Sequence, residues 1–484
     1  MVASTGSSSR EGWSSRSAFI LAAVGAAVGL GNVWRFPTLA GENGGGAFVL
    51  FYVACVFLLG LPLVLAEIFI GRTGQDDAVG SIRKVAERSG VSSAWSGFGI
   101  LGVIAAFLIV SFYSVVAGWV LYYVGVLGGD FLSAIASGDP FRGALVGESQ
   151  EAIQGRMGDL FANPGLLLAM HFVFMGVTLF IVARGIGSGI EAAATILMPM
   201  FFVLLVCMTI YGAFVGDMGK AVAFLFTPDW SRLSPAAMNT ALGQALFSLS
   251  LGVAGLITYG SYIKGSEGLG STSVTIAFAD TGVALIAGLM IFPIVFAVGL
   301  DPAAGPTLVF QTLPFAFQTM PAGALIGFLF FLLILVAAVT SSISLLEVPT
   351  AWGIGEMGWS RLTSSLVFGG AAFVIGIACL LGYNVWSDVR LLSFWPLFAE
   401  KDILDTVDGF TGTVMLPLGA FFTAIFVGWR ADRKLVEQMT GMSGAALGVW
   451  RFLLAWLCPI AVGLILVTGL VPAILTAEFW GMAA

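Results

Sequence analysis

Eleven long apolar runs restrict the fold of this chain of 484 residues more than any other feature. They lie near residues 17–40, 46–71, 97–127, 165–184, 190–215, 236–262, 273–300, 322–350, 362–382, 408–429 and 450–476. A helix needs roughly 20 mostly apolar residues to cross a bilayer. Only 10% of the residues are charged, compared with about 25% in average soluble domains. The runs therefore predict an all-α polytopic membrane protein and exclude a disordered or nucleic-acid-binding chain.

The distribution of basic residues predicts which side of the membrane each connection faces. With the N-terminus in the cytoplasm, 13 of the 20 Lys and Arg residues fall in cytoplasmic segments and 7 fall on the other side. Cytoplasmic connections carry the excess of Lys and Arg in membrane proteins. An odd number of spans separates the termini, so we expect a cytoplasmic tail at residues 1–16 and a C-terminus outside.

The first and sixth runs combine glycines with polar side chains at mid-membrane depth. The residues concerned are Gly25, Gly29, Gly31 and Asn32 in the first run, and Ser248, Ser250, Gly252 and Gly255 in the sixth. Either run alone is explained about as well by close helix packing through small residues. Two interrupted spans five apart, however, are what an inverted five-helix repeat predicts. The repeats would cover residues 17–215 and 236–430, with an eleventh helix at 450–476.

Five short motifs resemble the signature of the neurotransmitter:sodium symporter family. They are GNVWRFP at 31–37, ENGGGAF at 42–48, SLSLG at 248–252, TYGSY at 258–262 and TSS at 340–342. The resemblance extends from about Arg10 to the end of the eleventh span, and it is strongest to the bacterial branch that includes the leucine transporter LeuT. It implies a LeuT-like fold with discontinuous helices 1 and 6 in a bacterial inner membrane.

The resemblance implies sodium-coupled symport of a neutral amino acid by alternating access, with no nucleic acid and no obligate protein partner. The substrate residues that it implies are Ala27, Gly29, Leu30, Ile109, Tyr113, Phe247, Ser248, Ser250, Val253, Ser341 and Leu345. Free N–H groups at a helix break suit a carboxylate. Val253 stands where the leucine transporter has Phe, so we expect a larger apolar or aromatic substrate.

Two sodium sites are also implied, and oxygen ligands suit such a hard cation. The first would use Ala27, Asn32, Ser248 and Asp280 with the substrate carboxylate; the second would use Gly25, Val28, Ala337, Thr340 and Ser341. Asp280 replaces the Asn of many relatives, and Ala284 replaces a Ser that helps animal members bind chloride. A carboxylate at position 280 makes chloride unnecessary, and we therefore expect no chloride. A structural ion pair is the alternative role for Asp280.

The remaining charged and aromatic residues within or beside the spans suggest gates. By resemblance, Arg35 and Asp408 form an outer gate above Tyr113 and Phe247, although on sequence alone each also fits a snorkelling interfacial charge. Arg10 and Trp13 match an inner latch, whose acidic partner is unclear because position 355 is Gly and Glu356 is one residue away. Glu67 would brace the unwound backbone of the sixth span, and Glu347 has no assigned role.

The polar residues also bear on two other possible functions, an enzyme and a receptor or channel. His171 is the only His, and the chain has no H-E-x-x-H motif and no paired acid and nucleophile, so we expect no enzyme. A receptor or channel that binds the amino acid without coupled transport remains an alternative. The apolar outer connection 301–321 fits either a re-entrant lid or an interfacial segment.

Overall fold

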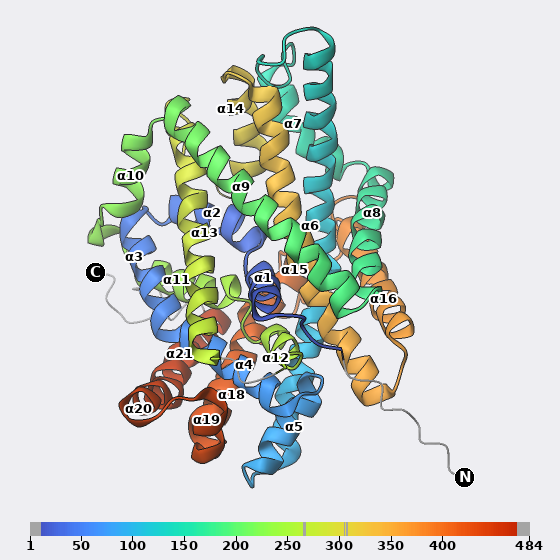
Figure 1. Cartoon of the computed structure of the whole chain (residues 1–484). Coiled ribbons are helices and arrows are strands. Elements are labelled where there is room, and N and C mark those ends of the chain that lie inside the picture. The colour runs from blue at the N-terminus through green and yellow to red at the C-terminus, as the bar shows by residue number, and fades with distance from the viewer. Residues whose placement is uncertain (1–10, 265–267, 304, 306–307, 472–484) are drawn as a thin grey trace.

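The computed structural model describes residues 11–264, 268–303, 305 and 308–471, and these form a bundle of helices (Figure 1). Among the described residues, nine spans are long and apolar enough to cross a membrane without a sharp break. In chain order they contain α3 Gly46–Cys55 with α4 Leu61–Gly74, α6 Gly97–Ala136, α8 Pro164–Ala183, α9 Ala192–Val215, α13 Leu269–Ala297, α15 Gly323–Met357, α16 Arg361–Leu381, α17 Ile403–Phe410 with α18 Leu416–Ile425, and α20 Gly444–Phe452 with α21 Cys458–Leu470.

Two further spans are interrupted, as the sequence predicts. The first consists of α1 Arg16–Ala27, a π-helical turn Gly31–Arg35 and α2 Phe36–Glu42, with a bend of 49°. The sixth consists of α11 Pro235–Ser248 and α12 Gly255–Gly260, separated by non-helical backbone. The nine spans and the bent first span make ten candidates within the described part of the chain, and the pair α11 and α12 occupies the place of the sixth predicted span.

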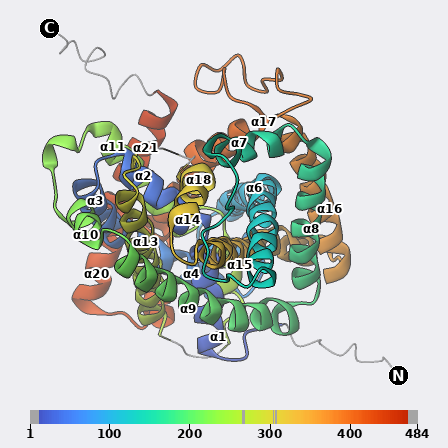
Figure 2. The same cartoon turned by 90° about the horizontal axis from the view of Figure 1, so that it is seen from above.

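Both interrupted spans lie inside the bundle. Helix α1 packs against α9, α13 and α15, and α12 packs against α4 and α15. Helices α8, α9 and α16 lie towards the outside when the bundle is seen from above (Figure 2). Backbone without helical hydrogen bonds is tolerated at membrane depth only inside protein or beside a cavity, and this placement meets that condition.

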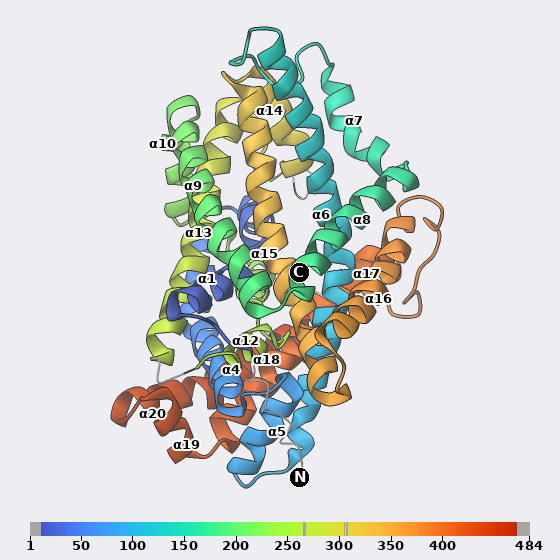
Figure 3. The ribbon, with the colours of Figure 1, turned by 45° about the vertical axis from the view of Figure 1, so that its right-hand side comes forward.

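Short helices cover the two ends of the bundle. One end, here called the tail side, holds residues 11–15, α5 Ala78–Arg88 and α19 Arg433–Thr440; the opposite end, the far side, holds α7 Gln150–Phe161, α10 Met218–Phe226 and α14 Leu313–Thr319 (Figure 3). The apolar connection before α15 is packed within the protein, because Leu308, Phe310 and Phe317 are buried. Its position favours the lid interpretation over a segment lying at the membrane interface.

Candidate functional site

The break in the first span leaves backbone groups free beside α15. Helix α1 ends at Ala27, and Val28 has extended backbone with φ −75° and ψ 109°. The hydroxyl of Ser341 donates to the carbonyls of Gly25 (3.3 Å) and Val28 (3.2 Å). A Cβ at Gly29 would lie 2.4 Å from the Ser341 Oγ, so only glycine allows this approach.

The break in the sixth span is held in an unusual backbone conformation. Ser250, Gly252 and Ala254 have φ of 52°, 84° and 58°. These values lie in the left-handed region, which residues other than glycine rarely adopt. The N–H of Gly252 donates to Glu67 Oε1 at 2.8 Å, and Glu67 is buried. Strained backbone of this kind gathers at ligand sites, where surrounding contacts maintain it.

A small cavity of about 40 Å³ lies where the two breaks meet. Its lining contains all eleven residues of the substrate site that the resemblance implies, together with Ala26, Gly31 and Leu416. Ile109 and Tyr113 come from α6, and Ser341 and Leu345 come from α15. The other residues of the implied substrate site lie in the two interrupted spans or in their breaks. Residues as far apart in the sequence as Ala26 and Leu416 therefore surround one space.

A buried polar cluster lies beside the small cavity. The Nδ2 of Asn32 donates to Asp280 Oδ1 at 2.7 Å, and the hydroxyl of Ser248 donates to the Asp280 oxygens at 2.7 and 2.8 Å. The hydroxyl of Tyr52 lies 3.2 Å from the Ser248 Oγ and 3.5 Å from Asp280 Oδ2. The three side chains implied for the first sodium site, Asn32, Ser248 and Asp280, thus meet around one carboxylate, and Tyr52 joins them. The Asp280 carboxylate has no basic partner within 4.0 Å among the described residues.

The residues implied for the second sodium site lie on the other side of the first break. Gly25 and Val28 present their carbonyls to Ser341, as described above. The Thr340 hydroxyl donates to the carbonyls of Val336 (3.2 Å) and Ala337 (3.0 Å) in its own helix. A Cβ at Gly25 would meet the Thr340 Cβ at 3.2 Å, which places this threonine against α1. Gly25 and Val28 of the first span therefore meet Thr340 and Ser341 of α15, and the Ala337 carbonyl lies one turn before Ser341.

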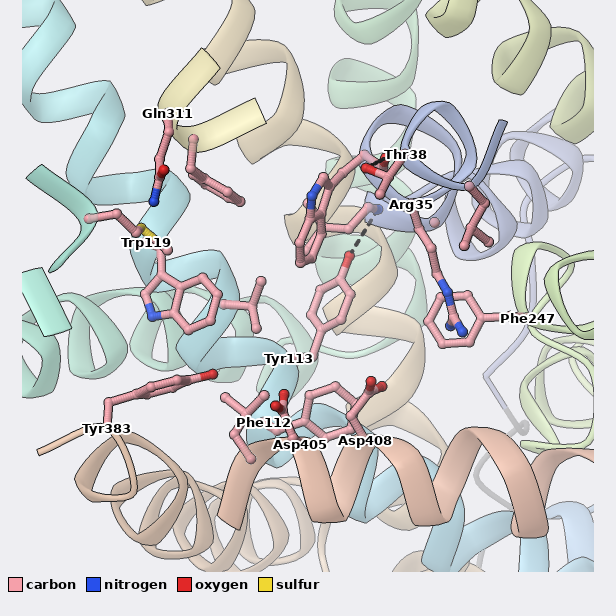
Figure 4. Close-up of a pocket in the computed structure, with 18 of the residues that line it drawn as sticks. Arg35, Thr38, Phe112, Tyr113, Trp119, Phe247, Gln311, Tyr383, Asp405 and Asp408 are labelled. Atoms are coloured by element: carbon pink, nitrogen blue, oxygen red, sulfur yellow. Dashed lines mark hydrogen bonds between the residues drawn. The ribbon is translucent and has the colours of Figure 1, made fainter. Parts of the chain in front are cut away.

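A larger cavity of about 460 Å³ lies on the far side of the small one. Leu30, Gly31, Tyr113 and Phe247 line both cavities and form the partition between them. Figure 4 shows Arg35 and Asp408 on the wall of the larger cavity.

The two implied outer-gate residues do not pair. The Arg35 guanidinium lies over the Phe247 ring, 4.2 Å from its centroid, and within the described chain no ion pair of 4.0 Å or less joins it to Asp408. The cavity that both residues line separates them.

The tail side is closed by residues 11–15. The Trp13 Nε1 donates to the Tyr259 carbonyl at 2.9 Å, and the Glu11 carboxylate lies 2.9 Å from the Arg361 guanidinium. Arg361 also pairs with the fully buried Glu347 at 2.8 Å, which gives Glu347 a partner that the sequence did not reveal. Arg10 lies outside the described residues.

Glu356, the acid that lies one residue from the position expected for a partner of Arg10, has another neighbour. Glu356 pairs with Arg83 at 2.8 Å. Gly355, the other position considered, packs against Asp77, whose Oδ2 would lie 2.3 Å from a Cβ at position 355.

Comparison with known proteins assigns the family. The model of the sodium:neurotransmitter symporter family matches residues 10–127 and 154–478. The chain belongs to the sodium:neurotransmitter symporter family. This symporter is thus a membrane-spanning, sodium-dependent transporter and not an enzyme.

Relatives and a solved structure agree with this assignment. The chain is 36% identical to the uncharacterized sodium-dependent transporter YhdH of Bacillus subtilis, over 93% of this chain and 95% of that protein. It is 33% identical to an uncharacterized sodium-dependent transporter of Haemophilus influenzae, over 96% and 99% of the two chains. The crystal structure of MhsT in complex with L-phenylalanine matches with a TM-score of 0.84 and 40% identity, over 95% of this chain and 100% of that one. The LeuT-like fold is therefore confirmed.

Three residues of the symporter site escaped the sequence analysis. Tyr52 lies in an apolar run with no break, and its contact with Asp280 spans 228 positions. Gln244 donates to the Gly31 carbonyl at 2.9 Å and ties the sixth span to the first. Leu416 lines the small cavity from the tenth span. A polar side chain in an apolar run was the only available signal for Tyr52 and Gln244, and Leu416 offered none.

Proposed function

We propose that this symporter couples the entry of sodium to that of a neutral, apolar or aromatic amino acid, without chloride. The observation that carries the proposal is the small cavity, which lies between the Asp280 cluster and the contact of α1 with α15. Substrate and two ions would bind within one region, at both breaks.

The cavity offers different chemistry at its two ends. The Leu30 N–H and the Tyr113 hydroxyl lie 3.5 Å apart at the first break, and they would donate to the substrate carboxylate. Carbonyls near Ala27 and Phe247 would accept from its ammonium group. Ile109, Val253 and Leu345 form an apolar end, with Leu416 beside them.

The substrate's size requires the cavity to widen. A volume of about 40 Å³ holds a few water molecules, since roughly 10–15 Å³ admits one. Tyr113 and Phe247 separate this space from the larger cavity, so a shift of these two rings enlarges it with the least disturbance to the helices. The bound L-phenylalanine of MhsT supports an aromatic substrate.

The first sodium ion would replace the hydrogen-bond donors around Asp280. Its ligands would be the Asp280 carboxylate, the Ser248 hydroxyl, the Ala27 carbonyl and the Asn32 side chain. Asn32 now turns its Nδ2 to Asp280 while its Oδ1 accepts from the Gly29 N–H at 3.1 Å, so its amide would rotate to ligate the ion. The substrate carboxylate completes the site, and each ligand thereby raises the affinity for the other.

The second sodium ion would lie between α1 and α15. Its ligands would be the carbonyls of Gly25, Val28 and Ala337 and the hydroxyls of Thr340 and Ser341. Ser341 already bridges two of these carbonyls, and the Thr340 hydroxyl would turn from its own helix to the ion. Such an ion would hold the interrupted span against a continuous one.

Chloride independence follows from the charge of Asp280. The carboxylate places a negative charge next to the first sodium, where chloride would otherwise provide it. Ala284, one turn later, has no hydroxyl to bind an anion. We further propose that the N-terminus is cytoplasmic, the C-terminus is outside and the membrane is a bacterial inner membrane.

The test is uptake of radiolabelled L-phenylalanine into proteoliposomes under an inward sodium gradient. We expect uptake that collapses when choline replaces sodium and is unchanged when gluconate replaces chloride. The variant Asp280→Asn should need more sodium, and Asp280→Asn with Ala284→Ser should regain activity only with chloride. Saturable binding without uptake would instead support a receptor, and a large loss of uptake in gluconate would exclude chloride independence.

The role of the second cluster needs its own comparison. Ser341→Ala should raise the sodium concentration needed for half-maximal uptake, whereas the matched variant Ser342→Ala should leave it unchanged. The hydroxyl of Ser342 is equally buried but lies 2.8 Å from the Thr178 hydroxyl, away from the break.

A further inference from the structure

The loop that joins α16 to α17 exposes an unusual set of large apolar side chains. Residues 382–402 contain no helix, and Figures 2 and 3 show them projecting beyond the surrounding helices. Five large apolar residues of this loop are exposed: Val385 (67%), Trp386, Val389, Leu391 and Phe394 (80%). Exposed apolar patches outside a protein's core mark interaction sites, and long loops without secondary structure are commonly functional.

Both ends of the loop are fixed to the bundle. The Tyr383 ring stacks on Phe161 with centroids 4.3 Å apart and an angle of 16°. At the other end, Phe398 is fully buried and packs against Trp395 and Phe410. The apolar side chains between these two attachments thus extend from a defined frame.

The backbone of the loop satisfies many of its own polar groups. The Trp386 N–H donates to the Leu381 carbonyl at 2.8 Å, and the Val389 N–H donates to the Trp386 carbonyl at 2.9 Å. The Arg390 guanidinium donates to the carbonyls of Ser387 (2.6 Å) and Val389 (3.2 Å). Unpaired backbone groups are costly in an apolar environment, so these bonds allow the loop to lie partly in lipid.

The position of the loop identifies its partner. Helix α16 begins at Arg361, which contacts the tail segment, and ends at Leu381, so the loop lies at the far side. The outer face of α16 carries exposed Leu366, Val367 and Val374, and in a membrane protein this face contacts acyl chains. The exposed apolar side chains of the loop follow directly on this helix in the chain.

We propose that the exposed apolar side chains of residues 385–394 insert into the boundary between headgroups and acyl chains of the far-side leaflet and act as a membrane anchor, while the exposed Asp388 and the Arg390 guanidinium remain among the headgroups. Tryptophan is enriched at this depth, and Trp386 lies among the inserted side chains. Because Tyr383 at the root of the loop also lines the larger cavity, contact with the leaflet would hold one wall of that cavity in place.

Site-directed fluorescence tests the anchor in the full-length protein. Cys207 is the exposed cysteine, whereas Cys55, Cys379 and Cys458 are buried, so Cys207→Ala provides the background. Phe394→Cys would carry an environment-sensitive nitrobenzoxadiazole label, in nanodiscs that hold one chain and contain phosphatidylcholine with or without a doxyl group at acyl carbon 5. The matched control is Ser137→Cys, exposed at the far end of α6. Leu391→Cys serves as a second test position.

We expect the labels at positions 394 and 391 to be quenched several-fold more by the doxyl lipid than by aqueous iodide. The label at position 137 should show the reverse. Quenching by iodide at 394 and 391 to the same extent as at 137 would overturn the proposal. So would protection that appears only in nanodiscs holding two chains, because the partner would then be a second copy and not the bilayer.

Discussion

Removal of the Ser248 hydroxyl is the most direct test of the proposed first sodium site. This hydroxyl donates to both Asp280 oxygens, at 2.7 and 2.8 Å, and lies 3.1 Å from the Asn32 Nδ2 and 3.2 Å from the Tyr52 hydroxyl. Hydrogen bonds to charged groups contribute about 1.5–3 kcal/mol. We therefore expect Ser248→Ala to destabilise the sodium-free protein by an amount in this range.

The substitution should also weaken sodium binding, in addition to its effect on folding. Without sodium, Asn32 and Tyr52 still donate to Asp280 in the variant, whereas the sodium-bound state loses an oxygen ligand outright. We expect the sodium concentration for half-maximal binding to rise at least tenfold, which corresponds to about 1.4 kcal/mol. The stabilisation that a fixed sodium concentration gives should shrink accordingly.

Two measurements on purified protein check these expectations. The first is a sodium titration of radiolabelled L-phenylalanine binding, and the second is the unfolding temperature with and without sodium. The control is Ser273→Ala in α13, because the buried Ser273 hydroxyl donates to the Leu269 carbonyl of its own helix, at 2.9 Å. A variant that loses stability like the control but keeps the wild-type sodium titration would refute the role of Ser248 as a ligand.

Three further predictions concern the second break, the substrate and the tail side. Gly252→Ala should abolish sodium-dependent binding, because its Cβ would lie 2.2 Å from the Leu416 carbonyl at φ +84°, whereas Gly412→Ala, with open space around it, should keep binding. Leu416→Ala should shift the uptake ratio towards bulkier amino acids and Leu416→Phe towards smaller ones; unchanged ratios in competition assays would contradict this. Burial raises the pKa of Asp77 to about 6, so the folded state binds a proton more tightly than the unfolded state and this group favours folding more as the pH falls from about 6 to 4. Asp77→Asn should therefore raise the unfolding temperature more at pH 7.5 than at pH 5; an equal gain at both pH values would contradict this.

Local signals in the sequence explain what could be predicted of the fold. Apolar runs and glycine-rich breaks depend on neighbouring residues only, and they gave eleven spans with interruptions in the first and sixth. The third helix shows the limit of this approach. The sequence predicts a span over 97–127, but α6 continues to Ala136 because Asp130 is paired with Arg142 at 2.7 Å and accepts from the Leu145 N–H at 2.8 Å.

Contacts between distant segments explain what the sequence did not reveal. The buried Glu347 has no signal for its partner, because Arg361 follows 14 residues later in the next helix and the hydroxyl of Tyr262, 2.6 Å from Glu347, is 85 positions away. A positional resemblance identifies residues that share a site, but it does not say which gate is closed. In this structure Arg35 and Asp408 line one cavity, and among the described residues no ion pair joins them.

The two ion pairs of Arg361 indicate which contact on the tail side breaks first when the small cavity opens towards that side. Glu347 is fully buried, and breaking one partner from such a pair costs about 3–5 kcal/mol. Glu11 is half exposed where it meets the same Arg361, and exposed ion pairs contribute roughly 0–1 kcal/mol. The ion pair that breaks when residues 11–15 leave therefore contributes far less than the one that joins α15 to α16. Because the Trp13 Nε1 donates to the Tyr259 carbonyl of α12, the same release removes one contact that holds α12, the half of the sixth span that begins directly after the break.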